Sequence, residues 1–369
     1  MKKNQFNFTI GLLSVCLLLF TACKKSDDAA KPSGGGGTVL PPPAKATSVM
    51  INGYFPNYSY TSTGYSSADY SNLTIAYYFS VTATSTGNLV TGGAGEETKM
   101  AAMISAAHAV GTKAYLCFGG AGSYGSQVYY DMAINDVSRK EFARQVKAFC
   151  LNKGFDGFDV DWEGLRSTQD GVAHEALLTS LKDSLHSVGL GLVATVQQGG
   201  SASFFTSNGM NQADLVQIMS YDATGTWNSS PYGQHSSYTF ASDGISYWNT
   251  TKGIAKPKLV LGVPFYGYQF NTSNACPCNA VRYKDIVANY PSLTDDVDFL
   301  NSGVYANTYF NGYQTLVDKI NLTYSSAMPG IMIWEITQDA SGSSSLLTRM
   351  KNFLVANNLS VKKLANSIP

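Results

Sequence analysis

Eight strand-like runs, several of them separated by helix-like segments, constrain the fold of this chain more than any other feature of its sequence. The helix-like segments are amphipathic and occupy residues 98–110, 138–153, 174–188 and 314–324. The strand-like runs occupy residues 49–55, 73–80, 113–118, 157–163, 191–197, 215–221, 258–266 and 331–336. Strands that alternate with helices are typical of a parallel sheet, and eight such units predict an α/β fold, a closed (β/α)8 TIM barrel.

The helix expected at residues 138–153 has signals at both ends. Ser138-Arg-Lys-Glu141 has the spacing of a capping box, in which two side chains satisfy the first free backbone N–H groups. Gly154 follows the last periodic residue and suits the left-handed conformation that ends many helices. The helix is therefore expected to stop just before the strand-like run at residues 157–163.

The first 48 residues differ from the rest in composition. Residues 1–22 have a basic start, an apolar stretch too short to span a membrane and small residues at the end, as secretory signal peptides do. Cys23 stands where a bacterial lipobox places its lipidated cysteine, although Phe20 replaces the usual aliphatic residue. Residues 24–48 are rich in Pro, Gly, Ser and Lys and are expected to form a flexible linker.

These segments predict a lipoprotein of the outer membrane or cell surface, attached by its lipid anchor only. The alternative is an ordinary signal peptide followed by an incidental cysteine. Residues 49–369 then remain as the folded domain, and about 320 residues suit one large barrel.

The balance of charges argues against a nucleic-acid partner, and the spacing of His and Cys argues against a bound metal ion. The chain has 25 Lys and Arg against 25 Asp and Glu, so no basic surface for nucleic acid is indicated. None of the four His is spaced as a metal-ligand pair, and Cys276-Pro-Cys278 lacks partners for a zinc site. Cys117 and Cys150 lie in apolar segments that favour free buried thiols. We expect no metal, no cofactor and a monomer.

The residues best suited to acid–base catalysis lie in the run Asp156-Gly-Phe-Asp159-Val-Asp161-Trp-Glu163. In an extended strand, side chains at i, i+2 and i+4 point the same way, with alternate residues about 7 Å apart. Asp159, Asp161 and Glu163 are therefore expected to project together. Asp156 is out of phase with them and is expected to have a structural role. The opposite face is apolar, which disfavours a solvated charge run or a cation-binding loop; it consists of Phe158, Val160 and Trp162.

Carboxylates this close cannot all ionise easily, because like charges raise the pKa of one or more of them. A carboxyl that stays protonated near neutral pH is what a general acid needs. In (β/α)8 barrels the catalytic groups lie at the C-terminal ends of the strands, where Glu163 falls. Glu163 is therefore the predicted general acid.

Six short motifs follow one another along the expected strands. They are Gly53-Tyr-Phe-Pro56, Lys113-Ala-Tyr-Leu-Cys-Phe-Gly-Gly120, the acidic run at 156–163, Met219-Ser-Tyr-Asp222, Leu261-Gly-Val-Pro-Phe-Tyr-Gly267 and Gly330-Ile-Met-Ile-Trp-Glu335. In this order they resemble glycoside hydrolase family 18, the chitinase family. The resemblance covers roughly residues 50–353 and implies the same barrel fold.

The resemblance implies a retaining cleavage in which the substrate's own 2-acetamido group is the nucleophile, an exception to the two-carboxylate scheme. Glu163 would protonate the glycosidic oxygen while the acetamido oxygen attacks the anomeric carbon to form an oxazolinium ion. Asp161 would orient the acetamido N–H and steady the positive charge. Asp159 would share a proton with Asp161, and Tyr221 would donate to the acetamido oxygen.

The resemblance also implies a set of substrate-binding residues. Trp334 would stack beneath the sugar at the cleavage point, and Asp222 would help to hold its distorted ring. The two glycines that end the second motif are expected to leave room for the acids. Trp227 is a weaker candidate, and His235, in a Gly/Ser/Tyr loop, is expected to be exposed. The predicted substrate-binding set is Trp334, Asp222, Met219, Tyr54, Gly120 and Tyr266.

The chain departs from the family pattern in several places. Cys117 replaces a serine near the acids, and Tyr268 stands where chitinases often carry Arg, which puts one sugar contact in doubt. Gly164-Leu165 follows Glu163 where many chitinases have Tyr-Pro. The stretch between Tyr266 and Trp334 is short, so a barrel without a large α+β insertion is expected. The resulting open groove favours endo cleavage over processive action.

The leading function is therefore the endo-hydrolysis of β-1,4-linked N-acetylglucosamine glycans, either chitin or chitooligosaccharides. An endo-β-N-acetylglucosaminidase that cuts the chitobiose core of N-glycans would use the same residues. A non-catalytic glycan-binding barrel is the third possibility, although such proteins usually lose the acid that Glu163 supplies. All three take an N-acetylglucosamine-containing glycan as partner.

Overall fold

The computed structural model describes residues 46–225, 232–270 and 279–366. Residues 46–369 form one compact unit, whose start lies three residues before the predicted domain boundary at 49. The signal peptide, Cys23, nearly all of the linker, Trp227 and the Cys276–Cys278 pair lie outside the described residues.

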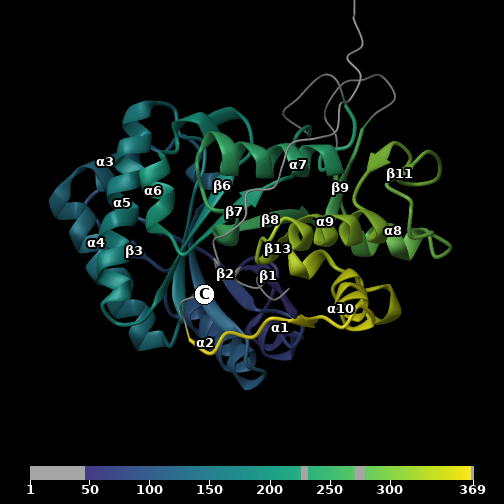
Figure 1. Cartoon of the computed structure of the whole chain (residues 1–369). Coiled ribbons are helices and arrows are strands. Elements are labelled where there is room, and N and C mark those ends of the chain that lie inside the picture. The colour runs from purple at the N-terminus through teal and green to yellow at the C-terminus, as the bar shows by residue number, and fades with distance from the viewer. Residues whose placement is uncertain (1–45, 226–231, 271–278, 367–369) are drawn as a thin grey trace, which may run out of the picture. The chain divides into compact units, whose positions relative to one another are not determined.

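Eight parallel strands close into a barrel (Figure 1). Each of the eight predicted runs contains most of one barrel strand. The barrel closes where the first two strands pair in parallel, with Asn52 opposite Ile75 at one end and Pro56 opposite Phe79 at the other. The strands, in sheet order from the first, are β1 (Ser48–Pro56), β13 (Gly330–Trp334), β8 (Leu259–Pro264), β7 (Leu215–Met219), β6 (Gly191–Gln197), β5 (Gly157–Trp162), β4 (Lys113–Gly120) and β2 (Ile75–Ala83). The predicted (β/α)8 fold is confirmed.

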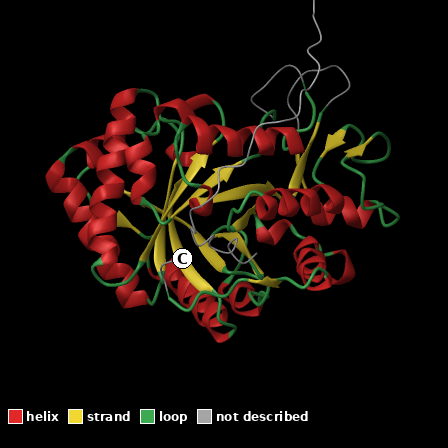
Figure 2. Cartoon of the chain, viewed as in Figure 1, coloured by secondary structure: helices red, strands yellow, loops and turns green. Residues whose placement is uncertain are grey.

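Helices surround the strands (Figure 2). Four of them correspond to the amphipathic segments found in the sequence, namely α2 (Ala94–Ala109), α4 (Asp136–Lys153), α5 (Thr168–His186) and α9 (Tyr313–Ser325). The others are α1 (Ser62–Ser67), α3 (Gln127–Ile134), α6 (Ser207–Gln212), α7 (Tyr238–Ser246), α8 (Tyr283–Asn289) and α10 (Leu346–Ala356). Two short strands, β3 (Leu89–Val90) and β14 (Ser360–Val361), extend the edges.

The buried apolar residues form two layers separated by the barrel wall. The larger cluster includes Phe158, Val160 and Trp162 and packs the outer side of the strands against the helices. The smaller cluster fills the barrel and includes Tyr54, Tyr77, Tyr115 and Cys117. As predicted, the apolar face of β5 packs outward, and its acids face the barrel interior.

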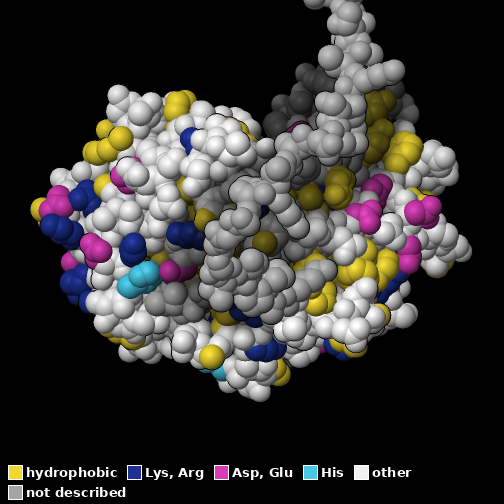
Figure 3. Space-filling model, viewed as in Figure 1, with side chains coloured by type: hydrophobic (Ala, Val, Ile, Leu, Met, Phe, Trp, Pro, Cys, Tyr) yellow, Lys and Arg dark blue, Asp and Glu magenta, His cyan; other side chains and the backbone are white. Residues whose placement is uncertain are grey.

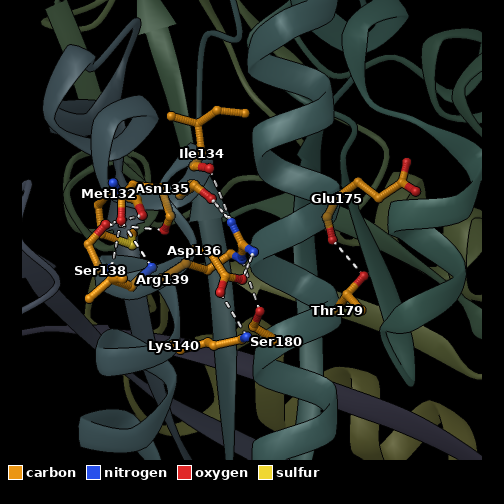
Figure 4. Close-up of polar contacts among 12 residues, drawn as sticks. Met132, Ile134, Asn135, Asp136, Ser138, Arg139, Lys140, Glu175, Thr179 and Ser180 are labelled. Carbon is orange, nitrogen blue, oxygen red and sulfur yellow. Dashed lines mark hydrogen bonds and ion pairs between the residues drawn. The ribbon is translucent and has the colours of Figure 1, made fainter.

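Helix α4 begins earlier than its sequence signals predict (Figure 4). Its N-cap is Asn135, whose side chain accepts from the backbone N–H groups of Val137 and Ser138 at 3.0 and 3.1 Å. Ser138 instead donates its hydroxyl to the carbonyl of Met132 at 2.9 Å, so the capping-box prediction was wrong. Gly154 ends the helix in the left-handed region at φ 88°, as expected.

A small folded insertion follows β8. It contains a four-stranded antiparallel sheet in the order β10-β9-β12-β11, together with α8. Its strands are β9 (Tyr266–Gln269), β10 (Asn279–Arg282), β11 (Phe299–Leu300) and β12 (Thr308–Tyr309). The insertion spans about 45 residues, so the described part of the barrel contains no large α+β domain, as expected. The small sheet itself was not predicted from the sequence.

The surface carries few charges for its size. Basic and acidic side chains are interspersed over the side of the molecule where α3 and α4 lie, and much of the face in view is uncharged (Figure 3). Within the residues that the structure describes, no helix has the length and apolar character needed to cross a membrane.

Candidate active site

The candidate site lies at the C-terminal ends of the barrel strands, where β5 carries its acids. Asp159 is fully buried and Asp161 is 3% exposed. A Cβ at Gly119 would lie 2.2 Å from the carbonyl oxygen of Asp161, and one at Gly120 would lie 2.1 Å from the ring of Phe79. Gly119 therefore leaves room for the acid strand, as predicted. Gly120 leaves room for Phe79 instead, and its predicted contact with substrate stays a prediction.

Asp159 is held by three donors inside the barrel. Tyr54 donates its hydroxyl to Oδ2 at 2.7 Å, and Thr195 donates to Oδ1 at 2.8 Å. The Cys117 thiol is also hydrogen-bonded to this carboxyl. Burial raises the pKa of Asp159 to about 6, while the three donors favour its charged form and lower the pKa in part. Cys117 thus keeps a donor where the family pattern has a serine.

Tyr54 requires a correction, since it was predicted to bind substrate. Its side chain is 1% exposed, and its hydroxyl faces Asp159, Thr195 and Gln217 at 2.7–2.8 Å. Because its polar end points into the barrel, Tyr54 supports the acid Asp159 from below.

Asp161 and Glu163 have strongly raised pKa values. Burial is the largest cause for Asp161, followed by the negative charges of Glu163 and Asp159, and together they raise its pKa well above the ordinary range. Burial, with the charge of Asp222, raises the pKa of Glu163 to about 7. Oδ1 of Asp161 is buried and has no hydrogen-bond partner among the described residues. The site thus combines a carboxyl protonated near neutral pH with a free buried acceptor beside it.

Tyr221 and Asp222 reach the same site from the end of β7. Tyr221 is 7% exposed, and its hydroxyl lies 4.0 Å from the sulfur of Met332, a weak acceptor. Asp222 adopts a left-handed backbone with φ 62° and accepts the hydroxyl of Tyr266 at 2.5 Å. Tyr266 is 6% exposed and its hydroxyl is engaged by Asp222, while its predicted contact with substrate stays a prediction.

His235 is buried beside Asp222, which overturns the expectation that it is exposed. It has no exposed surface, and its Nδ1 lies 3.3 Å from Oδ1 of Asp222. Its ring packs against Tyr266 and Tyr268, each with ring centres 5.0 Å away.

A cleft of about 730 Å³ opens above these residues, within the range typical of small-molecule sites. Four predicted site residues line it, namely Glu163, Met219, Tyr221 and Asp222. Trp334 is half-buried at the end of β13 and packs against Phe79 and Tyr54, with ring centres 4.6 and 5.5 Å apart. The cleft therefore extends from the acids along the β4–β7 side of the barrel mouth.

Several residues of the site were missed by sequence reasoning. Tyr124 is 67% exposed in the cleft, and its ring lies over Gly164, directly beside Glu163. Gln197 accepts from the N–H of Gly164 at 2.8 Å, and Ser123 accepts from the N–H of Glu163 at 3.0 Å. None of these lies in a recognisable motif, so no sequence signal identified them.

Asp156 has the structural role predicted for it. Its carboxyl accepts from His108 at 2.7 Å, from Lys113 at 3.1 Å and from the N–H of Ala114 at 2.9 Å. These contacts lie at the start of β4 and β5, at the opposite end of the strands from Glu163. Within residues 46–366, the described parts contain no cluster of three His, Cys, Asp or Glu placed to hold a metal ion.

A closed parallel barrel with a ladder of buried acids at its C-terminal end suits a glycoside hydrolase, which needs a carboxyl as general acid. The family model for glycosyl hydrolases family 18 matches residues 50–339, and the chain therefore belongs to this family.

Similar proteins agree with this assignment. The chain is 31% identical over 188 residues to a probable endochitinase of Caenorhabditis elegans, covering 45% of this chain and 30% of that protein. It is 25% identical over 261 residues to endochitinase 1 of Metarhizium robertsii, covering 59% of this chain and 60% of that protein. The chain thus spans between about a third and three fifths of the length of these relatives.

Solved structures share the fold. A chitinase from the chitin utilisation locus of Flavobacterium johnsoniae superposes with a TM-score of 0.72 at 24% identity, covering 87% of this chain and 99% of that chain. A class V chitinase of Nicotiana tobaccum in complex with NAG4 has a TM-score of 0.71 at 20% identity, covering 85% and 99%.

Proposed function

We propose that this protein is an endo-acting chitinase that cleaves β-1,4-linked N-acetylglucosamine chains with retention of configuration. The observation that carries the proposal is the ladder Asp159, Asp161 and Glu163, in which burial and the charge of Asp222 raise the pKa of Glu163 to about 7. A carboxyl with this pKa keeps its proton near neutral pH and regains it after each turnover. Glu163 faces the cleft and donates this proton to the glycosidic oxygen.

The nucleophile in this proposal is the acetamido oxygen of the substrate. Asp161 supports it, because its buried Oδ1 has no partner among the described residues and accepts the acetamido N–H. Tyr221 contributes a hydroxyl whose partner in the described part of the chain is only a methionine sulfur, so it is available to donate to the acetamido oxygen. As the N–H of the oxazolinium becomes acidic, Asp161 stabilises it after passing its own proton to Asp159, with which it shares one in this proposal.

The leaving group occupies the cleft in this proposal. Trp334, whose ring packs against Tyr54 and Phe79, supports the sugar whose bond is broken, while Tyr124 offers an exposed ring for the sugar beyond Glu163. Aromatic rings stack on the apolar faces of sugars. The small size of the insertion is the support for endo cleavage in this proposal. The structure of a relative with bound NAG4 supports this class of substrate.

Mass spectrometry of the products from chitohexaose tests the proposal, using residues 46–369, which form one compact unit. Short oligomers from the wild type and an intact hexamer with Glu163→Gln are expected. A fully deacetylated hexamer is the matched substrate control, since it lacks the acetamido nucleophile and is expected to survive. Intact chitohexaose with the wild type would contradict the proposal and direct attention to N-glycan cores or to binding alone.

We further propose that Cys23 carries a lipid and that residues 24–48 tether the barrel to the outer membrane or cell surface as a monomer. The support is the signal-like composition of residues 1–22 and the small residues before Cys23. Metabolic labelling with a radioactive fatty acid tests this, with Cys23→Ala as control. Equal labelling of both forms, or none of the wild type, would contradict it.

A further inference from the structure

Gln197, the last residue of β6, lines the cleft but has no part in the proposed reaction. It is half-buried and shares the wall of the cleft of about 730 Å³ with Glu163. Within the described part of the chain, the hydrogen bonds of its side chain all involve the amide oxygen. The amide nitrogen is the group whose use has to be explained.

The strand places Gln197 beside the end of the acid ladder. Residues two apart in a strand lie on the same face, and Thr195 on this face donates to Oδ1 of Asp159 at 2.8 Å. Gln197 lies one step nearer the barrel mouth, opposite Met219 of β7. It therefore reaches the level at which the chain leaves β5 after Glu163.

Two donors fix the orientation of the Gln197 amide. Its Oε1 accepts from the backbone N–H of Gly164 at 2.8 Å and from the hydroxyl of Ser201 at 2.5 Å. A backbone N–H only donates, so the atom that faces Gly164 is the oxygen and not the nitrogen. These bonds occupy both lone pairs of Oε1, and Nε2 is the end of the amide that remains available.

The backbone that holds this amide is itself held on both sides. Gly164 has a left-handed backbone with φ 67°. Ser123 accepts from the N–H of Glu163 at 3.0 Å, and the N–H of Gly125 donates to the carbonyl of Glu163 at 3.3 Å. Gln197 is thus attached to a fixed turn directly after the acid, and its amide plane is set before any ligand binds.

The Nε2 of Gln197 carries two hydrogens, and neither has an acceptor among the residues that the structure describes. The next residue behaves differently. Oε1 of Gln198 accepts from the hydroxyl of Ser220 at 2.7 Å, and its Nε2 donates to the carbonyl of Phe240 at 2.5 Å. Gln198 therefore uses both ends of its amide within the protein, whereas Gln197 keeps a donor for what enters the cleft.

We propose that Gln197 determines specificity in the leaving-group position: its Nε2 donates a hydrogen bond to an oxygen of the N-acetylglucosamine unit that lies beyond Glu163. The hydroxyl and acetamido carbonyl oxygens of this unit are acceptors. A ligand that covers Nε2 without an acceptor would leave a desolvated donor, which is costly. This inference rests on the proposed function and deepens it, because the bond favours a sugar over water at the same place.

The test uses chitobiose oxazoline, the proposed intermediate in preformed form, with chitotriose in excess as acceptor. Either chitotriose or water adds its O–H: the oxygen bonds to the anomeric carbon, the ring C–O bond opens and the proton goes to Glu163. Mass spectrometry gives the ratio of transfer to hydrolysis, as chitopentaose against chitobiose. A defect at Glu163 slows both outcomes, so this ratio reports the binding of the sugar.

Two variants separate the donor of Gln197 from its hold on Gly164. Gln197→Met removes both. Gln197→Glu keeps the oxygen that accepts from Gly164 and Ser201, but it donates nothing at pH 8, where its carboxyl is ionised. Both are expected to lower the ratio about fivefold, through the loss of one hydrogen bond to the sugar. A ratio in Gln197→Glu that equals or exceeds that of the wild type would overturn the proposal, since Gln197 would then only hold the turn.

Gln145→Met is the matched control. Oε1 of Gln145 on α4 also accepts from a backbone N–H, that of Leu89 at 3.0 Å, and Gln145 is not among the residues of the cleft. Its ratio is expected to equal that of the wild type. A fall as large as in the Gln197 variants would overturn the proposal.

The wild type separates this inference from the proposed function. If it does not consume the oxazoline, the proposed reaction is contradicted and the inference fails with it. If it consumes the oxazoline by hydrolysis alone, or if the ratio is the same in the Gln197 variants, the proposed reaction stands and only the role of Gln197 is overturned.

Discussion

A single thiol shows how the barrel interior tolerates a change in residue type. Cys117 stands in place of the serine of the family pattern, yet its thiol is hydrogen-bonded to Asp159. The thiol is a weaker donor than a hydroxyl, but it also fills apolar space beside Tyr54 and Tyr77.

Two substitutions of Cys117 distinguish its hydrogen bond to Asp159 from its apolar packing. Cys117→Ser keeps a donor of similar size, so kcat is expected to stay within about threefold of the wild type. Cys117→Ala removes the donor and raises the pKa of Asp159 further, and kcat is expected to fall about tenfold. Steady-state rates on chitohexaose measure both, and equal rates for the two variants would show that the thiol only packs.

The charge of Asp222 gives a second prediction at the residue scale. This charge is one of two causes that raise the pKa of Glu163 to about 7, and the larger cause is burial. The wild-type rate is therefore expected to fall above about pH 7 as Glu163 loses its proton. Asp222→Asn removes the negative charge, so the alkaline midpoint of kcat/KM should move to lower pH, whatever the loss in rate. A midpoint that rises instead would contradict this electrostatic account.

Sequence alone identified the acids but not what holds them. Asp159, Asp161 and Glu163 follow from strand periodicity, which is local. The contact between Tyr54 and Asp159 joins residues 105 positions apart, and the burial of His235 depends on rings of β9 that fold back onto its loop. Such long-range contacts produce no periodic pattern in the sequence. Tyr54 was therefore predicted to bind substrate, and His235 was predicted to be exposed.

At the scale of elements, α4 does not begin at the capping-box spacing of Ser138, because contacts with neighbouring residues set its start. Asn135 caps the helix because its side chain reaches two free N–H groups, while the hydroxyl of Ser138 is used by Met132 at the end of α3. Arg139 reinforces this corner by donating to Ser180 of α5 at 3.0 Å (Figure 4).

The cap gives a prediction for stability. Asn135→Ala is expected to lower the free energy of unfolding by about 1 kcal/mol, because two N–H groups lose their acceptor. Glu141→Gln is expected to leave it nearly unchanged, since Glu141 makes an exposed contact with Arg144 and a half-buried contact with Gln145. Urea unfolding followed by circular dichroism measures both. The reverse order of effects would restore the capping-box interpretation.

The barrel strands were predictable because each lies in a largely apolar run, several of them separated by amphipathic helix-like segments. The insertion was not, since β11 and β12 have two residues each and β9 follows β8 with one residue between them. Strands this short have no detectable period, and their pairing is set by contacts such as Tyr268–Ala280 that join distant segments.

At the scale of the whole molecule, acid stability depends on a histidine buried away from the site. His174 lies between Trp162 and Phe205 behind β5, and neither ring nitrogen has a partner among the described residues. Burial lowers the pKa of His174 to about 3. In the unfolded chain the imidazole ionises near its ordinary pKa of about 6.5.

The folded protein is therefore expected to lose stability as pH falls from about 6.5 to 3. In this range His174 binds a proton in the unfolded state but stays neutral in the folded state. The slope from this residue is about 1.4 kcal/mol per pH unit. His174→Met, which fills similar space without ionising, should flatten the curve by this amount. Unfolding free energies from urea titrations between pH 4 and 7 measure it, and parallel curves for the two proteins would contradict the assignment.

In the proposed reaction, Glu163 and the substrate's acetamido group act together in a double displacement. Proton NMR of the first products from chitohexaose, recorded before mutarotation, tests this most directly. We expect the new reducing ends to appear as the β-anomer and to equilibrate later to the α-anomer. First products in the α configuration would mean direct attack by water, and would contradict the mechanism proposed for this site.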